Sequence, residues 1–416
     1  MTSIGRRALP LRASTVVIGG GIQGLSVAYN LAALGQRDVV VLDAGYFQGG
    51  ASGRNGTLIR GGFMSDEWTG LFSLANRRWL ELSKRLRRNV MFSRRGYLLL
   101  AERPETAANF DHALTTHARH GVASRRLSRR QLEEIAPALD ATRIEDSIYF
   151  EAGGAAPHHA AMHAYLDACL DANVRVEYQA PVTRIERTGE HACAVIGSDF
   201  EIEVSSVVLA AGGSTNAVVR LAGLELPGFP MRIEAMALEP VRPIVRPAIA
   251  FIDSLCYLTQ TARGEIVGGA EVPERPHNSL QADLPAMAAT ARVYRDMLPC
   301  LSQLRILRHW AGTIHATPDF GPLIGTHPKC HNLWVTAGWS YGYASAPAVG
   351  ELLAKSILTN TLDPLLVPFA IDRFDRGAAI REGGIVLSTG ESSHALNPPA
   401  PKARADAADK SQGRQA

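Results

Sequence analysis

Paired cysteines, lysines and long apolar runs are all scarce in this sequence of 416 residues. The five cysteines are scattered and form no CxxC pair, which indicates reduced thiols in a cytoplasmic protein rather than a disulfide framework. No run of about twenty apolar residues occurs, so no transmembrane helix is expected. The segment from Met1 to Ser14 is also too polar for a signal peptide.

Charge of one sign is equally scarce, because the formal net charge is only +3. Only five of the 43 basic residues are lysine, and no dense basic cluster is interleaved with aromatic residues. A nucleic-acid-binding face is therefore not expected. Hydrophobic residues make up 46% of the chain and charged residues 20%, which is typical of a globular enzyme of about two domains.

The first periodic segment predicts a strand–helix–strand unit of the α/β class. Ser14–Gly21 is a β-branched run that ends in three glycines, as a buried parallel strand does. A helix is expected over 22–34, with Gly35 at its end, and a second buried strand over 38–43. This spacing suits a right-handed crossover.

The glycines between the first strand and the helix form a G-x-G-x-x-G fingerprint. Gly19 permits the tight turn, Gly21 lets the backbone approach a pyrophosphate, and Gly24 lets helix and strand pack closely. Asp43 follows 19 residues after Gly24, where its carboxylate can accept hydrogen bonds from a ribose. The complete unit predicts dinucleotide binding at the helix N-terminus. It does not separate FAD from NAD.

Further helices are expected at about 68–87, 104–120, 128–135, 157–172 and 284–298, and strands at about 174–178 and 182–187. Another apolar strand begins at Val207 and meets a glycine turn. Proline-broken short strands over 229–269 predict an antiparallel sheet. A glycine-rich stretch over 337–342 opens a last helix to about Leu358, and the tail 388–416 is expected to be disordered.

Several segments, in order, resemble the β subunit of heterotetrameric sarcosine oxidase, within the D-amino-acid-oxidase-like flavoproteins. The likeness covers most of residues 8–385, and the matching segments are 8–60, which includes the fingerprint, 89–98, 310–312, 317–325, 337–342 and 369–374. The resemblance implies a glutathione-reductase-like FAD domain (Rossmann-type) built from 8–95, 150–225 and 305–385. An interleaved antiparallel-sheet substrate domain would come from 96–149 and 226–304.

The resemblance also implies a set of residues that hold FAD, from the fingerprint, the glycine-rich loop and two later glycine turns. This set is Gly19, Gly21, Ile22, Gln23, Gly24, Asp43, Ala44, Ser52, Gly53, Arg54, Asn55, Val182, Ala211, Gly212, Gly338 and Gly342. By the same resemblance, Arg60 binds the substrate carboxylate while a hydride moves from carbon to the flavin. Tyr343 and His315 complete the expected catalytic set, although a core or surface place for His315 is equally open. The helix that Ser345 or Ala346 caps, with Pro347 in its first turn, is expected to point at the flavin.

One departure from the family pattern bears on the substrate. Where sarcosine oxidases carry Gly-Phe-Lys-Ala-Thr-Pro, this chain has Tyr343-Ala-Ser-Ala-Pro, so the family lysine is replaced by Ala344. The change argues against sarcosine itself and against fast reaction with oxygen. An opine, D-amino-acid or imino-acid dehydrogenase subunit is therefore an alternative, and a non-catalytic flavin-binding subunit is another.

His158 occupies the register of a family histidine that is tied covalently to FMN at a subunit interface. The resemblance thus implies FMN at His158 and partner subunits, while the alternative is a histidine pair that opens a helix. No metal site is expected, because the pair His327 and His331 lacks a second ligand pair.

Overall fold

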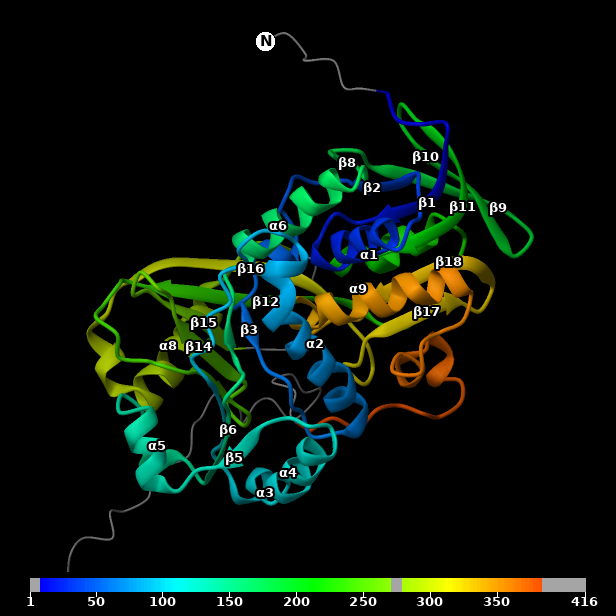
Figure 1. The fold of residues 1–416 in the computed structure, drawn as a ribbon. Coiled ribbons are helices and arrows are strands. Elements are labelled where there is room, and N and C mark those ends of the chain that lie inside the picture. Colours follow the sequence, from blue (N-terminus) through cyan, green and yellow to red (C-terminus); the bar gives the residue numbers. More distant parts are fainter. Residues whose placement is uncertain (1–7, 271–278, 384–416) are drawn as a thin grey trace, which may run out of the picture.

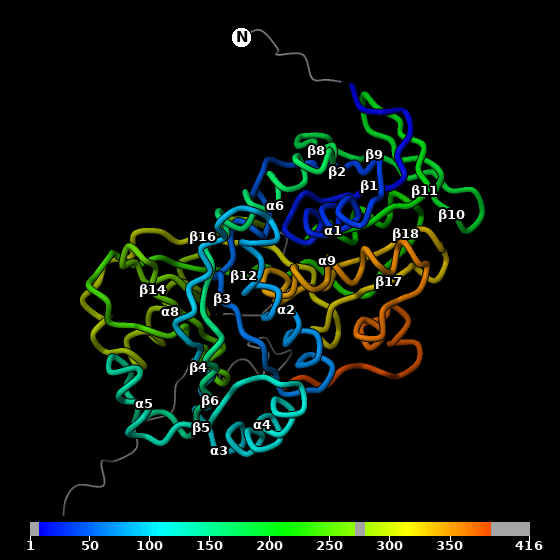
Figure 2. The backbone as a smooth tube through the Cα atoms, viewed as in Figure 1, coloured from blue at the N-terminus to red at the C-terminus, as the bar shows by residue number. Residues whose placement is uncertain are grey.

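The computed structural model describes residues 8–270 and 279–383, and the predicted disordered tail lies outside these ranges. Within these ranges the chain forms two eight-stranded sheets and a small two-stranded one, β3 (Leu58–Ile59) with β7 (Gly154–Ala155). Figure 1 shows the two large sheets side by side, with helices between and around them. The chain visits each sheet more than once, so that each sheet contains segments of several different colours in Figure 2.

The first sheet is mainly parallel and has the order β17-β18-β11-β1-β2-β8, with β10 and β9 extending from β11. Strands β1, β2, β8, β11 and β18 run parallel, whereas β17 pairs antiparallel with β18. The strand bounds are β1 Arg12–Ile18, β2 Val39–Asp43, β8 Arg175–Tyr178, β9 Val182–Thr188, β10 His191–Gly197, β11 Glu201–Leu209, β17 Leu323–His327 and β18 Cys330–Ala337. This confirms the predicted Rossmann-type α/β fold.

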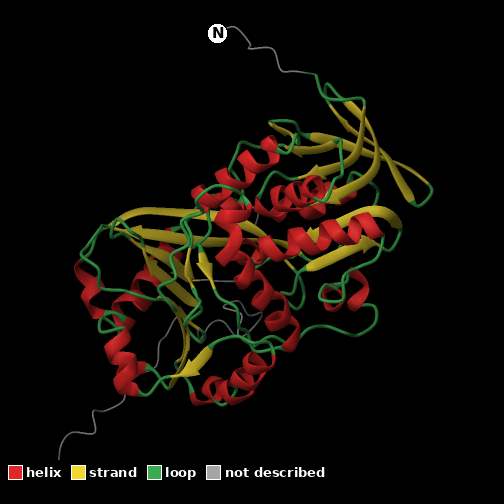
Figure 3. Cartoon of the chain, in the orientation of Figure 1, coloured by secondary structure: helices red, strands yellow, loops and turns green. Residues whose placement is uncertain are grey.

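Four helices share one buried apolar cluster with this sheet. They are α1 (Ile22–Ala33), α2 (Asp66–Arg85), α6 (His158–Asp171) and α9 (Gly342–Thr359), and α2 joins the cluster by packing on α9. Helices α1 and α9 approach so closely that a Cβ on Gly350 would lie 2.1 Å from Ser26 Oγ. Figure 3 shows this helical layer beside the strands that it covers. The short helix α7 (Thr215–Arg220) follows β11.

The second sheet has the order β16-β12-β15-β14-β13-β4-β6-β5 and is antiparallel except where β13 pairs with β4. Its bounds are β4 Tyr97–Ala101, β5 Ser124–Arg126, β6 Asp146–Phe150, β12 Phe229–Leu238, β13 Ala248–Phe251, β14 Cys256–Gln260, β15 Ile266–Ala270 and β16 Ile306–Ala316. Residues of α5 (Arg129–Ile135) and α8 (Leu284–Met297) share a buried cluster with this sheet.

Two expected helices differ in detail from the structure. The helix expected over 104–120 is divided into α3 (Pro104–Ala107) and α4 (Phe110–Arg119). The cap expected at Ser345 or Ala346 is wrong, because α9 begins at Gly342 with Tyr341 as its N-cap and Pro347 inside the helix. The backbone N–H of Ser345 already donates to Tyr341 O at 3.2 Å, so the helical turn begins earlier.

The division into domains stays a prediction, and β16 bears on one of its boundaries. The expected boundary at residue 305 would place β16 with the FAD-binding pieces, yet β16 pairs along its length with β12 of the second sheet. By sheet membership, the boundary falls between β16 and β17.

Candidate active site

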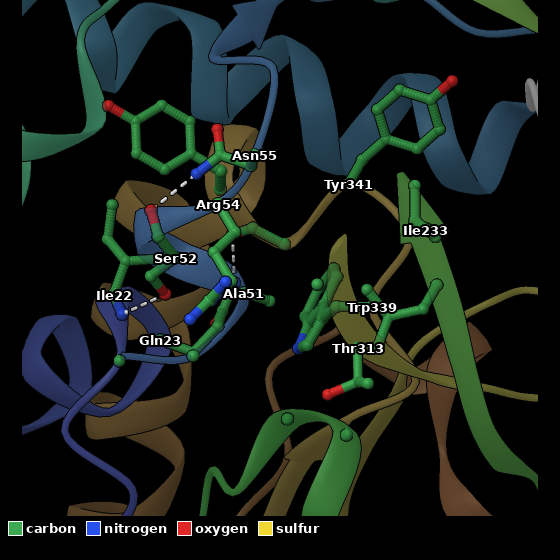
Figure 4. Close-up of a pocket in the computed structure, with 18 of the residues that line it drawn as sticks. Ile22, Gln23, Ala51, Ser52, Arg54, Asn55, Ile233, Thr313, Trp339 and Tyr341 are labelled. Atoms are coloured by element: carbon green, nitrogen blue, oxygen red, sulfur yellow. Dashed lines mark hydrogen bonds between the residues drawn. The ribbon is translucent and has the colours of Figure 1, made fainter. Parts of the chain in front are cut away.

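A cavity extends from the N-terminus of α1 across to the second sheet. Its volume is about 280 Å³, which is near the lower end of the ~300–1,000 Å³ of usual ligand pockets. Six segments of the chain contribute most of its lining: Gly19–Gln23, 48–58, 210–214, 233–235, 312–315 and 338–344. Figure 4 shows Trp339 between the loop of Ala51–Asn55 and the strands that carry Ile233 and Thr313.

The fingerprint glycines lie too close to neighbouring backbone atoms to carry side chains. Gly19 has a φ of +119°, and a Cβ there would lie 2.3 Å from Ala210 O. A Cβ on Gly24 would lie 1.9 Å from Gly19 O. Gly21, the N-cap of α1, carries no side chain to satisfy the first-turn N–H groups. The cradle at this helix end therefore fits a pyrophosphate in both shape and charge.

Asp43 at the end of β2 is anchored beside this cradle. Its Oδ2 accepts a hydrogen bond from Gly20 N at 2.7 Å and its Oδ1 accepts one from Gly45 N at 2.8 Å. The carboxylate lines the cavity while these two bonds fix its orientation. A ribose hydroxyl could bind the lone pairs that remain.

The glycine-rich loop after β2 folds back over the helix N-terminus. Ser52 Oγ accepts from Ile22 N at 2.9 Å, and Asn55 Nδ2 donates to Ser52 O at 2.6 Å. Asn55 Oδ1 accepts from Thr57 N at 2.7 Å, so its side chain shapes the turn. Figure 4 shows the first two of these bonds at the wall of the cavity.

Arg54 fastens this loop to the second sheet. Its guanidinium donates to Gly49 O at 2.9 Å and to Ala311 O at 3.1 Å, and Trp310 Nε1 donates to Arg54 O at 2.9 Å. Both Arg54 and the neighbouring Tyr46 line the cavity. The side chain therefore holds the two halves of the cavity wall together, independently of any phosphate contact.

Gln23 joins α1 to α9 through its side-chain amide. Nε2 donates to Gly342 O at 2.6 Å, and Oε1 accepts from Thr336 Oγ1 at 3.2 Å. Of the other residues expected to hold FAD, those that line the cavity are Gly19, Gly21, Ile22, Asp43, Ser52, Arg54, Asn55, Ala211, Gly212, Gly338 and Gly342. Those outside the described lining are Gly24, Ala44, Gly53, Val182 and also His158.

Arg60 is buried directly behind the cavity wall, with 2% of its surface exposed. Its guanidinium carbon lies 4.1 Å from the ring centroid of Phe63, 5.3 Å from that of Tyr97 and 5.4 Å from that of Tyr341. Nη1 also donates to Tyr97 Oη at 3.4 Å. Since Tyr97 and Tyr341 both line the cavity, the positive charge lies one ring away from its interior.

Tyr343 and Ala344 contribute to the wall at the start of α9. The hydroxyl of Tyr343 donates to Ala156 O at 2.9 Å, and burial raises its pKa well above the usual range. The carbonyl of Ala344 accepts from Trp79 Nε1 at 2.8 Å. A catalytic role for Tyr343 stays a prediction, and its hydroxyl is engaged by the backbone.

His315 on β16 lines the cavity and is 1% exposed. Among the described residues, neither of its ring nitrogens has a hydrogen-bond partner. Burial lowers its pKa to about 4, so the imidazole is neutral at pH 7. A neutral imidazole offers one donor and one acceptor.

His158 is the first residue of α6. Burial, with the positive charge of neighbouring His159 and Arg308, lowers its pKa to about 4. The neutral imidazole is the form whose ring nitrogen can act as a nucleophile. His158 is not among the residues that line the cavity.

The sequence did not identify two tyrosines of the cavity as site residues. Tyr97 on β4 and Tyr257 on β14 reach it from the second sheet. Their only signal was a polar hydroxyl inside or beside an apolar strand, which most tyrosines share.

Two findings concern the part of the chain that the structure describes. None of its helices is both long and apolar enough to cross a membrane. None of its His, Cys, Asp and Glu side chains gather in threes as metal ligands, and His327 Nε2 lies 2.9 Å from Glu225 O.

The sequence of this chain matches a known protein family and is similar to several characterised proteins. The sequence profile described as FAD dependent oxidoreductase (DAO) matches residues 14–356. Sarcosine oxidase subunit beta of Rhodobacter capsulatus is 26% identical over 377 residues, covering 89% of this chain and 91% of the relative. The same subunit of Rhizobium meliloti is 28% identical over 375 residues, covering 89% and 90%.

Among solved structures, L-proline dehydrogenase from P. horikoshii superposes with a TM-score of 0.84 at 27% identity. The superposition covers 89% of this chain and 99% of that one.

Proposed function

The chain belongs to the DAO family of FAD-dependent oxidoreductases, and from that premise we propose that it oxidises a C–N bond of a small amine or amino acid. The observation that carries the proposal is the continuity of one cavity. The same space is bordered by the glycine cradle at α1 and by Tyr97, Tyr257 and Tyr341 at the second sheet. A dinucleotide at one end would thus face a substrate at the other.

When bound, FAD supplies the hydride acceptor that turns a C–N single bond into C=N. The chain's own residues bind and orient. Gly19 and Gly21 admit the pyrophosphate, and Asp43 receives a ribose hydroxyl. Arg60, behind the rings of Tyr97 and Tyr341, supplies positive potential that attracts a substrate carboxylate. His315 and Tyr343 complete the proposed set at the wall.

The test is anaerobic reduction of the FAD-loaded protein by a panel of candidates. Sarcosine, dimethylglycine, glycine, L-proline and D-amino acids are mixed with the enzyme, with lactate as a hydroxy-acid control, while flavin absorbance is followed. We expect bleaching by at least one amine and none by lactate. Bleaching by lactate alone would refute C–N oxidation. Binding of FAD without reduction by any amine, alone or with partner subunits, would favour a non-catalytic flavin-binding subunit instead.

The second candidate is an imino-acid, opine or D-amino-acid dehydrogenase that passes electrons to an acceptor other than oxygen. Ala344 at the family's lysine position favours it, since the chain lacks that cation beside the cavity. The likeness to L-proline dehydrogenase supports it as well. Stopped-flow reoxidation of the reduced protein by oxygen and by an artificial acceptor separates the two functions.

Two finer features extend the proposal. FMN attached covalently at His158 is supported by the lowered pKa of this histidine and by its separation from the main cavity. Partner subunits are supported by relatives that are themselves beta subunits, and a cytoplasmic location is supported by the five scattered cysteines. Acid precipitation tests the FMN link, because a colourless pellet would exclude it and a His158→Ala variant should lose any colour. Co-purification with the products of neighbouring coding sequences tests the assembly.

A further inference from the structure

His315 differs from the other buried histidines whose contacts are described. His117 holds Phe63 O at 2.8 Å and Ser124 Oγ at 2.8 Å, and His327 holds Glu225 O at 2.9 Å and Lys329 N at 3.1 Å. His315 is as deeply buried, yet both of its ring nitrogens are without a hydrogen-bond partner among the described residues. A buried polar group left in this state destabilises a fold unless something else satisfies it.

The surroundings of His315 place it beside the second glycine turn. A Cβ on Gly213 would lie 2.5 Å from Thr313 Oγ1, so β16 presses against this turn two residues before His315. A Cβ on Gly228 would lie 2.8 Å from two atoms of the His315 ring. Thr313, His315 and the turn residues Ala211–Ser214 all line the cavity.

A second unsatisfied polar atom lies in the same neighbourhood. Asn216 Nδ2 donates to Leu226 O at 3.1 Å and to Gly228 O at 3.2 Å, whereas its Oδ1 is buried without a partner among the described residues. Gly228 therefore lies next to both Asn216 and the ring of His315. Asn216 is not part of the cavity lining, whereas His315 is, so a ligand in the cavity would satisfy the ring nitrogens of His315.

We propose that His315 is a cofactor-positioning residue whose neutral imidazole hydrogen-bonds the bound flavin dinucleotide beside the second glycine turn. The inference rests on the proposed function only for the identity of the cofactor. Both ring nitrogens of His327 are engaged in hydrogen bonds within the protein, so this histidine cannot bind a ligand. His315 retains one hydrogen-bond donor and one acceptor for a ligand. The cost of leaving them unpaired falls on the apoprotein alone.

The experiment compares His315→Leu with His327→Leu, a matched buried histidine whose nitrogens are both engaged. FAD affinity of the apoprotein is measured by isothermal titration, and apoprotein stability by thermal unfolding. For His315→Leu we expect the FAD Kd to rise about tenfold, as loss of one hydrogen bond predicts, with an apoprotein Tm that is equal or higher. For His327→Leu we expect a lower Tm and an unchanged Kd.

The variant His315→Gln provides the rescue, because its amide keeps a donor and an acceptor, and its Kd should lie between those of wild type and His315→Leu. A Kd for His315→Leu within about twofold of wild type would overturn the proposal. So would a fall in apoprotein Tm as large as that of His327→Leu, since that would mark a structural role. Neither result bears on which substrate is oxidised, so this proposal and the proposed function fail independently.

Discussion

At the residue scale, the contacts of each polar side chain show whether it stabilises the fold or is available to bind a ligand. Gln23, Arg54 and Asn55 were expected to hold FAD, and their side chains are engaged with other parts of the chain. They shape the wall that a cofactor would touch. His315 differs, since neither of its ring nitrogens has a hydrogen-bond partner among the described residues. Arg60 lies behind the wall, packed against aromatic rings and bonded to Tyr97 Oη.

Arg60→Met should weaken substrate binding and leave FAD binding intact. The guanidinium stacks on three rings and lies outside the glycine cradle, so its loss removes attraction for a carboxylate without altering the dinucleotide site. We expect kcat/KM to fall about tenfold, which corresponds to roughly 1.4 kcal/mol, because the charge acts on the carboxylate from behind the rings rather than by direct contact. Steady-state kinetics with the best amine of the panel and an FAD titration measure both quantities. An unchanged kcat/KM would remove Arg60 from the site.

Acid should weaken the apoprotein through its buried neutral histidines. Burial lowers the pKa of His117, His158 and His315 to about 4, below the unfolded value near 6.5. Below pH 6.5 the unfolded chain takes up protons that the folded chain does not, so stability falls until about pH 4. Each histidine accounts for up to about 2 kcal/mol by pH 5. Thermal unfolding from pH 7.5 to pH 5 should show this loss, with a shallower slope for His315→Leu. Equal slopes would contradict it.

At the element scale, the contact between α2 and α9 depends on a cluster of charged residues that no local sequence pattern predicted. Glu351 on α9 is bound by Arg78 and Arg85 of α2, both at 2.7 Å, and by Lys355 at 2.9 Å. Burial alone would raise the pKa of Glu351, but these hydrogen bonds lower it well below its usual range. Because α9 also carries the cavity residues from Gly342 onward, this cluster positions one wall of the site.

Glu351→Gln should therefore destabilise the protein by about 2 kcal/mol, because two arginines lose their counter-charge. Glu81→Gln is the matched control, since Glu81 lies 3.6 Å from Arg78 and is largely exposed, and it should cost at most about 0.5 kcal/mol. The pKa of Glu351 is depressed in the fold, so its contribution is complete above about pH 4.5 and is lost as pH falls below that. Urea unfolding at pH 7 and pH 4 measures both effects. Similar losses for the two variants would contradict the assignment.

The elements that the sequence predicted well are those with a local signature. The unit β1–α1–β2 has an apolar periodicity, and it has glycines at which a Cβ would collide with Ala210 O or Gly19 O. These residues are therefore compatible with few other local structures. The cap of α9 was misplaced, because Gly342 and Pro347 are poor helix formers and tertiary bonds from Gln23, Ser26 and Trp79 stabilise the first turns. Tyr97 and Tyr257 could not be assigned to the site, since β4 and β14 meet the cavity only through long-range pairing.

At the scale of the whole molecule, the two sheets are tied together mainly around the cavity. The loop of Arg54 binds Ala311 of the second sheet, and Thr313 of that sheet packs on the turn after β11. A bound dinucleotide would touch elements of both sheets, whose residues alternate along the chain. Ligand binding and the cohesion of the sheets are therefore coupled.

Added FAD should for this reason raise the stability of the entire chain in one transition rather than that of the first sheet alone. At a free concentration of 100 times Kd, linkage predicts about 2.7 kcal/mol. Calorimetry with and without FAD should show one peak that moves upward, and hydrogen exchange should slow in β12 and β16 as well as in β1 and β2. Gly24→Ala, whose Cβ has no room beside Gly19 O, should abolish the shift. Protection confined to the first sheet would show that the second sheet contributes to the cavity wall without responding to the cofactor.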